Sequence, residues 1–549
     1  MNTLHSIGTL ALLSLASTSI SSGQGLGPPS APPENPITQA KTFLGQALFW
    51  DEQLSTLDTV ACATCHLPEA AGADPRTLAD LAGSTYVGVD RIFGTADDTH
   101  SSPSISSHRP AHSYIFRQLT GMGPQLTFRH TPQVFDAAYA PELLLDGRAP
   151  GAFVDPMSGL TISSSGAALE SQALLPLTDE KEMAFFERPV AEILDDVRDS
   201  QPLYLAGNIP ATLSSWIAGR DYELLFADAF GSPGITTTRV AQALATYMRT
   251  LVTYDQLPFD DFLNGDQNAL TAEERAGYGV FVSKGCATCH PGAILTDHLY
   301  RNIGLDDLGD DPGRRRVSLV AADQGKFRSP SLRNLALTAP YFHDGSAITI
   351  ADVIEFFDVG GHFNVPNKDP LIQPLGMSAQ EKSDLAAFLG NPLTDPRAAN
   401  FEGPYERLTL YAESTEAPTL FGTATPGTNG TSPKLTLLEP TRLGHTITVA
   451  VEAAASGAPA ALVVSTSSMP LGIPFQGVQL YVPLNSASST HRVLLSTQGL
   501  GPGSESVRLT LPADPIFDGT SLYAQWLIYD PSPQGRLAAS EAVEMHLFN

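Results

Sequence analysis

The pentapeptide Cys-Ala-Thr-Cys-His occurs twice in this chain, and the two copies contain all four of its cysteines. The residues are Cys62, Cys65 and His66 in the first copy and Cys286, Cys289 and His290 in the second. Two thiols three positions apart lie one helical turn from each other, so they can form thioether bonds to the two vinyl groups of one haem. The His that follows can then bind the iron as an axial ligand. The repeat predicts two covalently bound c-type haems.

Two other chemistries use Cys-x-x-Cys pairs. One pair can form a thioredoxin-like redox couple, and two pairs can form a four-thiolate zinc site. Neither chemistry needs a His directly after the second Cys, yet both copies have one in a chain with only 13 His among 549 residues. We therefore favour haem attachment over zinc or a disulfide.

The charge and the N-terminal sequence restrict partners and location. A formal net charge of -27 argues against nucleic acid and anionic membranes as partners. Residues 9–16 form an apolar run too short to cross a bilayer, and small residues follow it to about residue 24, as in a secretory signal peptide. Because bacterial c-type haems are attached outside the inner membrane, these features predict a periplasmic or secreted protein that is not an integral membrane protein.

Local patterns predict helices before residue 400 and strands after it. Thr271 with Glu274, and Ser378 with Glu381, are capping boxes that predict two helix starts. Trp50 is interpreted as a packing residue rather than an electron relay, and no regular element is predicted in the weakly periodic residues 67–125. After about residue 408, β-rich segments separated by turn residues predict an all-β sandwich-like module: 446–452, 461–465, 507–511 and 522–528.

Several motifs occur in a fixed order around the two haem sites. They are LGQALFWD (44–51), TPQVFD (131–136), DGR (146–148), DPGR (311–314), PSLRN (330–334) and LTAPYFHDG (337–345), together with Gln172 and the pair Glu182-Met183. Through these motifs, residues 44–393 resemble the bacterial di-haem cytochrome c peroxidases and their relatives of the MauG type. The β module lies outside this resemblance.

The resemblance implies a mainly α fold, with two cytochrome-c-like helical haem domains followed here by the C-terminal all-β sandwich-like domain. We expect a signal peptide (1–24), a linker (25–36), an N-terminal peroxidatic haem domain (37–262), a C-terminal electron-transfer haem domain (263–400) and a β domain (401–549). His66 would be the proximal ligand of the peroxide-reactive iron, and His290 that of the electron-transfer iron. Glu182 corresponds to the family's catalytic glutamate and Gln172 to its distal glutamine.

The chain departs from the family at the distal ligands. Met122, in Gly-Met-Gly, stands where peroxidases commonly have a His, so either its thioether binds the first iron or that position is open. Phe357, fourteen residues after His343, stands where relatives have a Met or Tyr ligand, and phenylalanine cannot bind iron. Either His362 or Met377 replaces it, or the second haem is five-coordinate.

Other departures concern the region between the haems. Leu145 replaces the Trp that bridges the haems in the family. The resemblance implies that calcium would bind the backbone carbonyls of Thr338 and Pro340, but His130 replaces the Asn ligand. Because a hard cation prefers oxygen to imidazole, this replacement argues against calcium. His108 and His112 are expected to be surface residues rather than ligands.

Three functions follow from these residues. The leading hypothesis is an oxidoreductase that reduces hydrogen peroxide to water with electrons from a donor such as a small cytochrome c or a cupredoxin. The second is a MauG-like, peroxide-dependent oxidation of residues on a partner protein, with the β module recruiting that protein. The third is a non-catalytic electron-transfer cytochrome in which two protein ligands occupy both irons.

Overall fold

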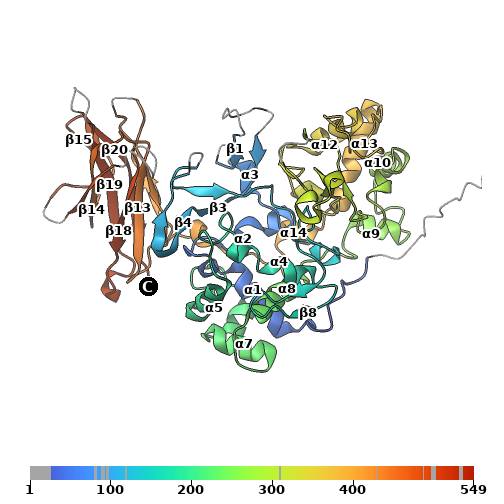
Figure 1. Ribbon diagram of the computed structural model, residues 1–549, viewed down its shortest axis with the longest axis horizontal. Helices are drawn as coiled ribbons and strands as arrows, with labels where there is room; N and C mark the ends of the chain where they lie inside the picture. The colour runs from blue at the N-terminus through green and yellow to red at the C-terminus, as the bar shows by residue number, and fades with distance from the viewer. Residues whose placement is uncertain are drawn as a thin grey trace, which may run out of the picture.

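Figure 1 shows the computed structural model of the protein, in which the helices lie mostly before residue 400 and the strands of the larger sheets after it. The structure describes residues 26–79, 83–87, 93, 95, 98–117, 120–307, 311–427, 430–485, 488–495, 503–530 and 536–549. The predicted signal peptide lies outside these residues. Residues 26–38 contain no helix or strand, and the buried Asn35 side chain donates to Glu170 Oε1 (2.8 Å) and to the Gln242 carbonyl (2.9 Å).

The first 270 residues form short helices and very short strands. The helices are α1 (Gln39–Trp50), α2 (Cys62–Cys65), α3 (Arg76–Ala79), α4 (Ala168–Ala173), α5 (Val190–Asp199), α6 (Ala211–Ile217), α7 (Tyr222–Phe230), α8 (Thr237–Met248) and α9 (Pro258–Leu263). The strands are β1 (Thr85–Tyr86), β2 (Thr99–His100), β3 (Pro103–Ser106), β4 (His108–Arg109), β5 (Ser113–Tyr114), β6 (Pro124–Leu126), β7 (Phe153–Val154) and β8 (Thr161–Ser163). The region 67–125, in which no element was predicted, thus contains several of these strands.

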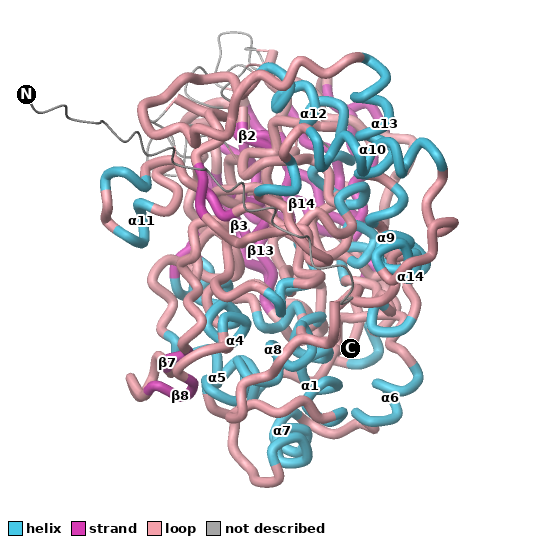
Figure 2. The backbone as a smooth tube through the Cα atoms, turned by 90° about the vertical axis from the view of Figure 1, so that its right-hand side faces the viewer, coloured by secondary structure: helices cyan, strands magenta, loops and turns pink. Residues whose placement is uncertain are grey.

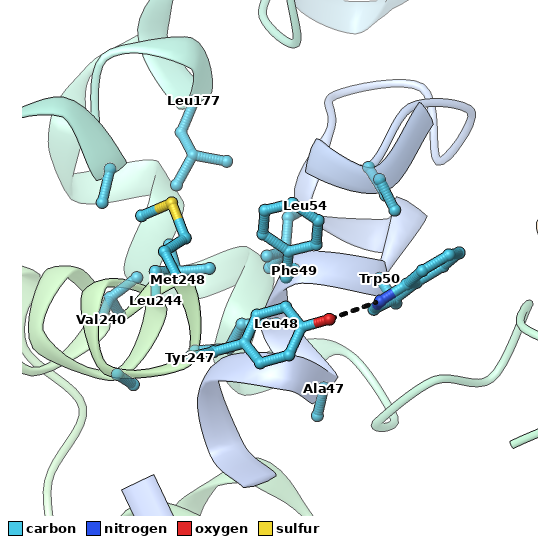
Figure 3. Close-up of a cluster of buried hydrophobic side chains, with 14 of the residues drawn as sticks. Ala47, Leu48, Phe49, Trp50, Leu54, Leu177, Val240, Leu244, Tyr247 and Met248 are labelled. Carbon is cyan, nitrogen blue, oxygen red and sulfur yellow. Dashed lines mark hydrogen bonds between the residues drawn. The ribbon is translucent and has the colours of Figure 1, made fainter. Parts of the chain in front are cut away.

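Helices α1 and α8 pack at unusually close range. A Cβ at Gly45 would lie 2.0 Å from the Ala243 carbonyl oxygen, so only glycine allows this approach. Figure 3 shows buried side chains of these two helices, including Trp50, which is 1 % exposed and donates from Nε1 to the Tyr247 hydroxyl (3.4 Å). Trp50 is a packing residue, as expected. The contact fixes α1, which leads to the first haem motif.

A second group of helices surrounds the second motif. Its elements are α10 (Ala272–Ser283), β9 (Tyr300–Arg301), α11 (Arg315–Ser318), β10 (Phe327–Arg328), α12 (Ile350–Val359), α13 (Ala379–Leu389) and α14 (Pro396–Asn400). Both predicted capping boxes are confirmed, at the starts of α10 and α13. These two helices also meet at a glycine, because a Cβ at Gly277 would lie 1.9 Å from the Asp384 carbonyl oxygen. Figure 2 shows α10, α12 and α13 grouped away from α1, α7 and α8.

The C-terminal residues form two larger antiparallel sheets and a two-stranded antiparallel sheet, β15-β16. The strands are β11 (Thr419–Phe421), β12 (Lys434–Leu437), β13 (Thr446–Glu452), β14 (Pro459–Ser465), β15 (Ile473–Phe475), β16 (Val478–Leu480), β17 (Ser489–Leu494), β18 (Glu505–Thr510), β19 (Ser521–Tyr529) and β20 (Leu537–His546). The five-stranded sheet has the order β11-β20-β19-β14-β17, and the three-stranded sheet has the order β12-β13-β18. Side chains of both sheets, such as Val449 and Trp526, share one buried cluster. This arrangement is a β-sandwich.

The three regions are joined through buried contacts. Between the two helical regions, the fully buried Arg333 forms a bidentate ion pair with Asp260 (2.7 Å for each bond) and donates to Thr253 Oγ1 (2.8 Å). On the other side, Leu438 and Ala450 of the sandwich belong to the same buried cluster as α1 and α8. The structure contains both helices and sheets. The exact boundaries of the predicted domains stay a prediction. Among the described residues, no helix is long and apolar enough to span a membrane.

Candidate haem cavity and peroxide site

One cavity of about 1000 Å³ is lined by both pentapeptides. This volume is at the upper end of the roughly 300–1,000 Å³ that small-molecule and cofactor sites occupy. Its walls include Cys62, Cys65 and His66 from the first motif, and Cys286, Cys289 and His290 from the second motif. The two motifs, more than two hundred residues apart in the sequence, thus face the same space.

Each motif histidine is oriented by a backbone carbonyl. His66 Nδ1 bonds with the Gly72 carbonyl oxygen (2.6 Å), and His290 Nδ1 bonds with the Leu295 carbonyl oxygen (2.9 Å). Since a carbonyl can only accept, Nδ1 carries the proton in both rings and Nε2 keeps its lone pair. Burial also lowers the pKa of both imidazoles, which favours the neutral, ligating form.

The cysteines of the motifs are suited to thioether formation. All four are unpaired, and burial raises the pKa of Cys62 and Cys65 to about 12, so both thiols are protonated at neutral pH. Together with the free Nε2 atoms, this donor set fits two c-type haems, each held by two thioethers and one imidazole.

Glu182 lies against the cavity near the first motif. It follows a tight turn in which the N–H groups of residues 182–184 donate to the Asp179 carbonyl oxygen (3.1, 3.1 and 3.0 Å). Burial raises the pKa of Glu182 to about 7, the Asp179 carboxylate adds to this rise, and the Arg148 guanidinium opposes it. The charge of Glu182 also contributes to the raised pKa of Cys62 and Cys65, and all three residues line the same cavity. A carboxyl group half ionised at neutral pH can both accept and donate a proton.

Gln172 lines the same cavity from the last turn of α4. The structure therefore brings both predicted catalytic residues, Gln172 and Glu182, to the cavity that His66 also lines.

Met122 lies elsewhere. Its side chain is 1 % exposed, and Met122 is not among the described residues that line the cavity. Its backbone N–H donates to Glu452 Oε2 (2.9 Å), because the Gly-Met-Gly turn packs against β13 of the sandwich. These contacts give no support to ligation of the first iron by Met122.

The candidate ligands near the second motif differ in position. Met377 lines the cavity and is 8 % exposed. His362 is exposed and packs edge-on against Phe356 (ring centroids 4.8 Å apart). Phe357, at the family's ligand position, also lines the cavity. Of the three, only Met377 combines burial in this space with an atom able to bind iron.

Leu145 lines the cavity, and its carbonyl oxygen accepts from the Arg328 N–H (2.8 Å). Beside it, the rings of Phe327 and His343 stack with centroids 3.9 Å apart. Phe327 and His343 line the same cavity as Leu145, which stands at the position of the family's bridging Trp.

The predicted calcium ligands do not form an oxygen-rich site. Thr338, Pro340 and His130 all line the cavity, but His130 contributes nitrogen, and neither of its buried ring nitrogens has a hydrogen-bond partner of ordinary geometry. Burial lowers the pKa of His130 to about 4, so the ring is neutral. Among the described residues, no group of three or more His, Cys, Asp or Glu side chains could hold a metal ion. The residues present do not fit a hard cation.

The expectation of two surface histidines is wrong for His108. Its side chain is buried, Nδ1 bonds with the Ser106 carbonyl oxygen (2.8 Å), and Nε2 bonds with Thr56 Oγ1 (2.9 Å). His112 is partly buried and pairs with Glu439 of the sandwich (3.1 Å). Neither environment was visible in the sequence, because the partners lie far away along the chain.

Comparison with known proteins identifies the family. The sequence model described as di-haem cytochrome c peroxidase matches residues 39–268. The methylamine utilization protein MauG of Methylorubrum extorquens is 31% identical over 371 residues, which cover 67% of this chain and 82% of MauG. The chain belongs to the di-haem cytochrome c peroxidase family. The predicted resemblance is therefore confirmed, and the protein is a di-haem cytochrome c peroxidase-like oxidoreductase.

Other relatives of this peroxidase-like protein show both branches of the family. The cytochrome c551 peroxidase of Pseudomonas aeruginosa is 29% identical over 328 residues, which cover 58% of this chain and 72% of that protein. Among solved structures, a MauG-like protein associated with microbial copper homeostasis has a TM-score of 0.50 and 25% identity, covering 71% of this chain and 98% of its own. The family implies haem cofactors and peroxidase-type chemistry.

Proposed function

We propose that this enzyme reduces hydrogen peroxide to water at the haem held by Cys62, Cys65 and His66, with electrons that pass through the haem held by Cys286, Cys289 and His290. A haem bound at the first motif supplies the iron that binds peroxide and delivers electrons to it. The observation that carries the proposal is the Glu182 carboxyl group, which lines the cavity beside the first motif with a pKa of about 7.

Glu182 supplies the proton transfers. As a carboxylate it accepts the proton of the near peroxide oxygen, and as an acid it returns that proton to the far oxygen, which leaves as water. In total, two electrons and two protons convert one peroxide into two water molecules. The Gln172 carboxamide, which faces the same space, orients peroxide through a hydrogen bond.

The shared cavity favours electron transfer between the two haems. His290 and Met377 line it at the second motif, and we propose Met377 as the second axial ligand there, since thioether ligation raises the potential of a haem. The external donor is a small cytochrome c or a cupredoxin. A donor with a basic docking face suits the net charge of -27. We also propose that the protein works in the periplasm or outside the cell, where such donors occur.

A second candidate function is the oxidation of residues on a partner protein. The MauG relatives at 30% and 31% identity support it, as do Met122 and Phe357, which stand where peroxidases commonly have iron ligands. In this alternative the β-sandwich recruits the partner, for example through the exposed Leu471 and Ile473 (98% and 52%). The family membership makes a non-catalytic electron carrier the weakest of the three hypotheses, and we do not propose it.

Peroxide turnover separates the two candidates. The holoprotein is mixed with peroxide and a reduced small cytochrome, and both peroxide loss and donor oxidation are followed. Rapid loss of one peroxide for every two donor electrons supports the peroxide-reducing function. Slow donor oxidation, with a mass change in a co-purified partner protein, supports protein oxidation, and no loss of peroxide contradicts both.

A further inference from the structure

The backbone just before Glu182 is held by a hairpin from another part of the chain. This segment, called the β3–β6 hairpin, runs from β3 through β4 and β5 to β6 and is described at residues 103–117 and 120–126. Its first and last strands pair antiparallel, with Pro103 opposite Leu126. Gln125 Nε2 donates to the Glu180 carbonyl oxygen (2.7 Å), and Ser104 Oγ donates to the Lys181 carbonyl oxygen (2.5 Å). Both side chains are buried, so these bonds have little competition from water. The hairpin thus fixes the two peptide groups that precede Glu182.

The opposite end of the same hairpin is held by the β-sandwich. The Glu452 carboxylate, at the end of β13, accepts from the Met122 N–H (2.9 Å) and is 7 % exposed. The contact is so close that a Cβ at Gly121 would lie 1.8 Å from Glu452 Oε2, and Gly121 has a φ of 63°. The left-handed backbone favours glycine at 121, and any larger side chain there would also displace the Glu452 carboxylate from this contact.

Glu439 makes a second connection between the sandwich and the hairpin. Its Oε1 atom accepts from the Tyr114 hydroxyl (2.6 Å) and pairs with His112 Nδ1 (3.1 Å). The same carboxylate accepts from the N–H (2.6 Å) and the hydroxyl (3.0 Å) of Thr448 on β13. Figure 1 shows β3 and β4 beside β13, in agreement with these bonds. A buried carboxylate with this many donors holds two elements in one arrangement.

We infer that the β-sandwich is a positioning element of the peroxide site. Glu452 and Glu439 fix the β3–β6 hairpin, and Gln125 and Ser104 of the hairpin fix the backbone from which the Glu182 carboxyl group projects into the cavity. This inference rests on the proposed function in one respect, the acid/base role of Glu182. It assigns the sandwich a role within the chain itself, whether or not the sandwich also recruits a partner.

The test measures the protonation and the activity of Glu182 separately. The charged groups that act on the Glu182 carboxyl group are Asp179 and Arg148. The neutral thiols of Cys62 and Cys65 line the same cavity and become thioethers when haem is attached. An infrared titration of the holoprotein follows the carboxyl band that disappears in Glu182→Gln. Stopped-flow mixing with peroxide gives the rate of the first reaction and its saturation, so that kcat and KM effects are resolved.

Four variants are compared. Glu452→Ala removes the acceptor for the Met122 N–H, and Glu452→Gln keeps an oxygen that can accept the same bond. Gln125→Met removes the donor to the Glu180 carbonyl at nearly constant volume. Glu505→Ala is the matched control, because Glu505 lies on the neighbouring strand β18 opposite Val451 and its carboxylate accepts from its own neighbour, Ser506.

We expect Glu452→Ala and Gln125→Met to lower the pH midpoint of the Glu182 band and to slow the peroxide reaction ~10-fold in kcat, because a displaced carboxyl group is better hydrated and misaligned. Glu452→Gln restores both quantities, and Glu505→Ala changes neither. If Glu452→Ala and Gln125→Met keep the wild-type midpoint and rate, the inference is wrong.

Two controls keep the result interpretable. Haem content and circular dichroism are measured for each variant, and Glu452→Asp, which keeps the charge but moves the acceptor, replaces Glu452→Ala if the latter does not fold. If the wild-type protein does not react with peroxide at all, the proposed function fails, but the infrared midpoints still decide whether the sandwich positions Glu182.

Discussion

Replacing Glu182 by Gln is the most informative single substitution at the proposed site. The rise of its pKa from 4.5 to about 7 means that the cavity favours the neutral acid over the carboxylate by ~3 kcal/mol relative to water. Acid and base forms are therefore similarly populated at neutral pH. Gln has nearly the same size and shape but can neither accept nor return a proton under these conditions.

The expected result follows from the proton transfers. Loss of a positioned acid/base slows the peroxide reaction by ~10²–10⁴-fold. In the wild-type protein the carboxylate is the form that accepts the first proton. Its rate should therefore fall ~10-fold for each pH unit below about 6 and level off above about 8. This inflection should disappear in Glu182→Gln, whose residual rate should not depend on pH near 7.

Stopped-flow absorbance of the haem bands, at several peroxide concentrations and across pH, measures both effects. The matched control is Glu402→Gln, because Glu402 is exposed, is not among the described residues that line the cavity, and undergoes the same chemical change. A Glu182→Gln rate within a few-fold of wild type, or an inflection near pH 7 that persists in the variant, would refute the acid/base assignment.

Three further predictions concern other residues. Burial raises the pKa of Glu52 to about 8 from 4.5, so the native protein keeps a proton that the unfolded chain releases, and stability falls as pH rises between these values. Glu52→Gln, which keeps the acceptor for the Tyr411 N–H, should therefore raise the melting temperature more at about pH 8 than at about pH 5, and equal effects at both would contradict this. Arg333→Met leaves Asp260 buried without its partner and should lower the free energy of unfolding by ~3–5 kcal/mol in urea titrations, whereas a loss below ~1 kcal/mol would show that the pair matters little. Met377→Leu should lower the reduction potential of the second haem and change its optical spectrum, and an unchanged spectrum would exclude Met377 as a ligand.

Features that depend on neighbouring residues could be predicted from the sequence. The haem motifs need only residues within five positions, and the capping boxes at Thr271 and Ser378 need only four, so short-range pattern was sufficient for both. The strand predicted at 446–452 is confirmed as β13, because a run of β-branched residues is also a local signal.

The contacts that position the proposed site could not be predicted from the sequence, because they join segments that are distant along the chain. Glu439 and Glu452 are isolated acidic residues in a β-rich sequence, where a solvated carboxylate is the ordinary interpretation. Their partners Tyr114 and Met122 are 325 and 330 residues away. The β3–β6 hairpin itself has short strands rich in Ser and Pro without a clear period, so no sequence pattern predicts it. His108 was misjudged for the same reason, since its partner Thr56 is 52 residues away.

The central claim is that the two haems are not equivalent and that the His66 haem reacts with peroxide. Electron paramagnetic resonance of the oxidised holoprotein, before and after one equivalent of peroxide, tests it most directly. We expect one haem with an open coordination position, whose signal changes on mixing, and one low-spin haem with two axial ligands. Two low-spin haems whose signals are unaffected by peroxide would contradict the account.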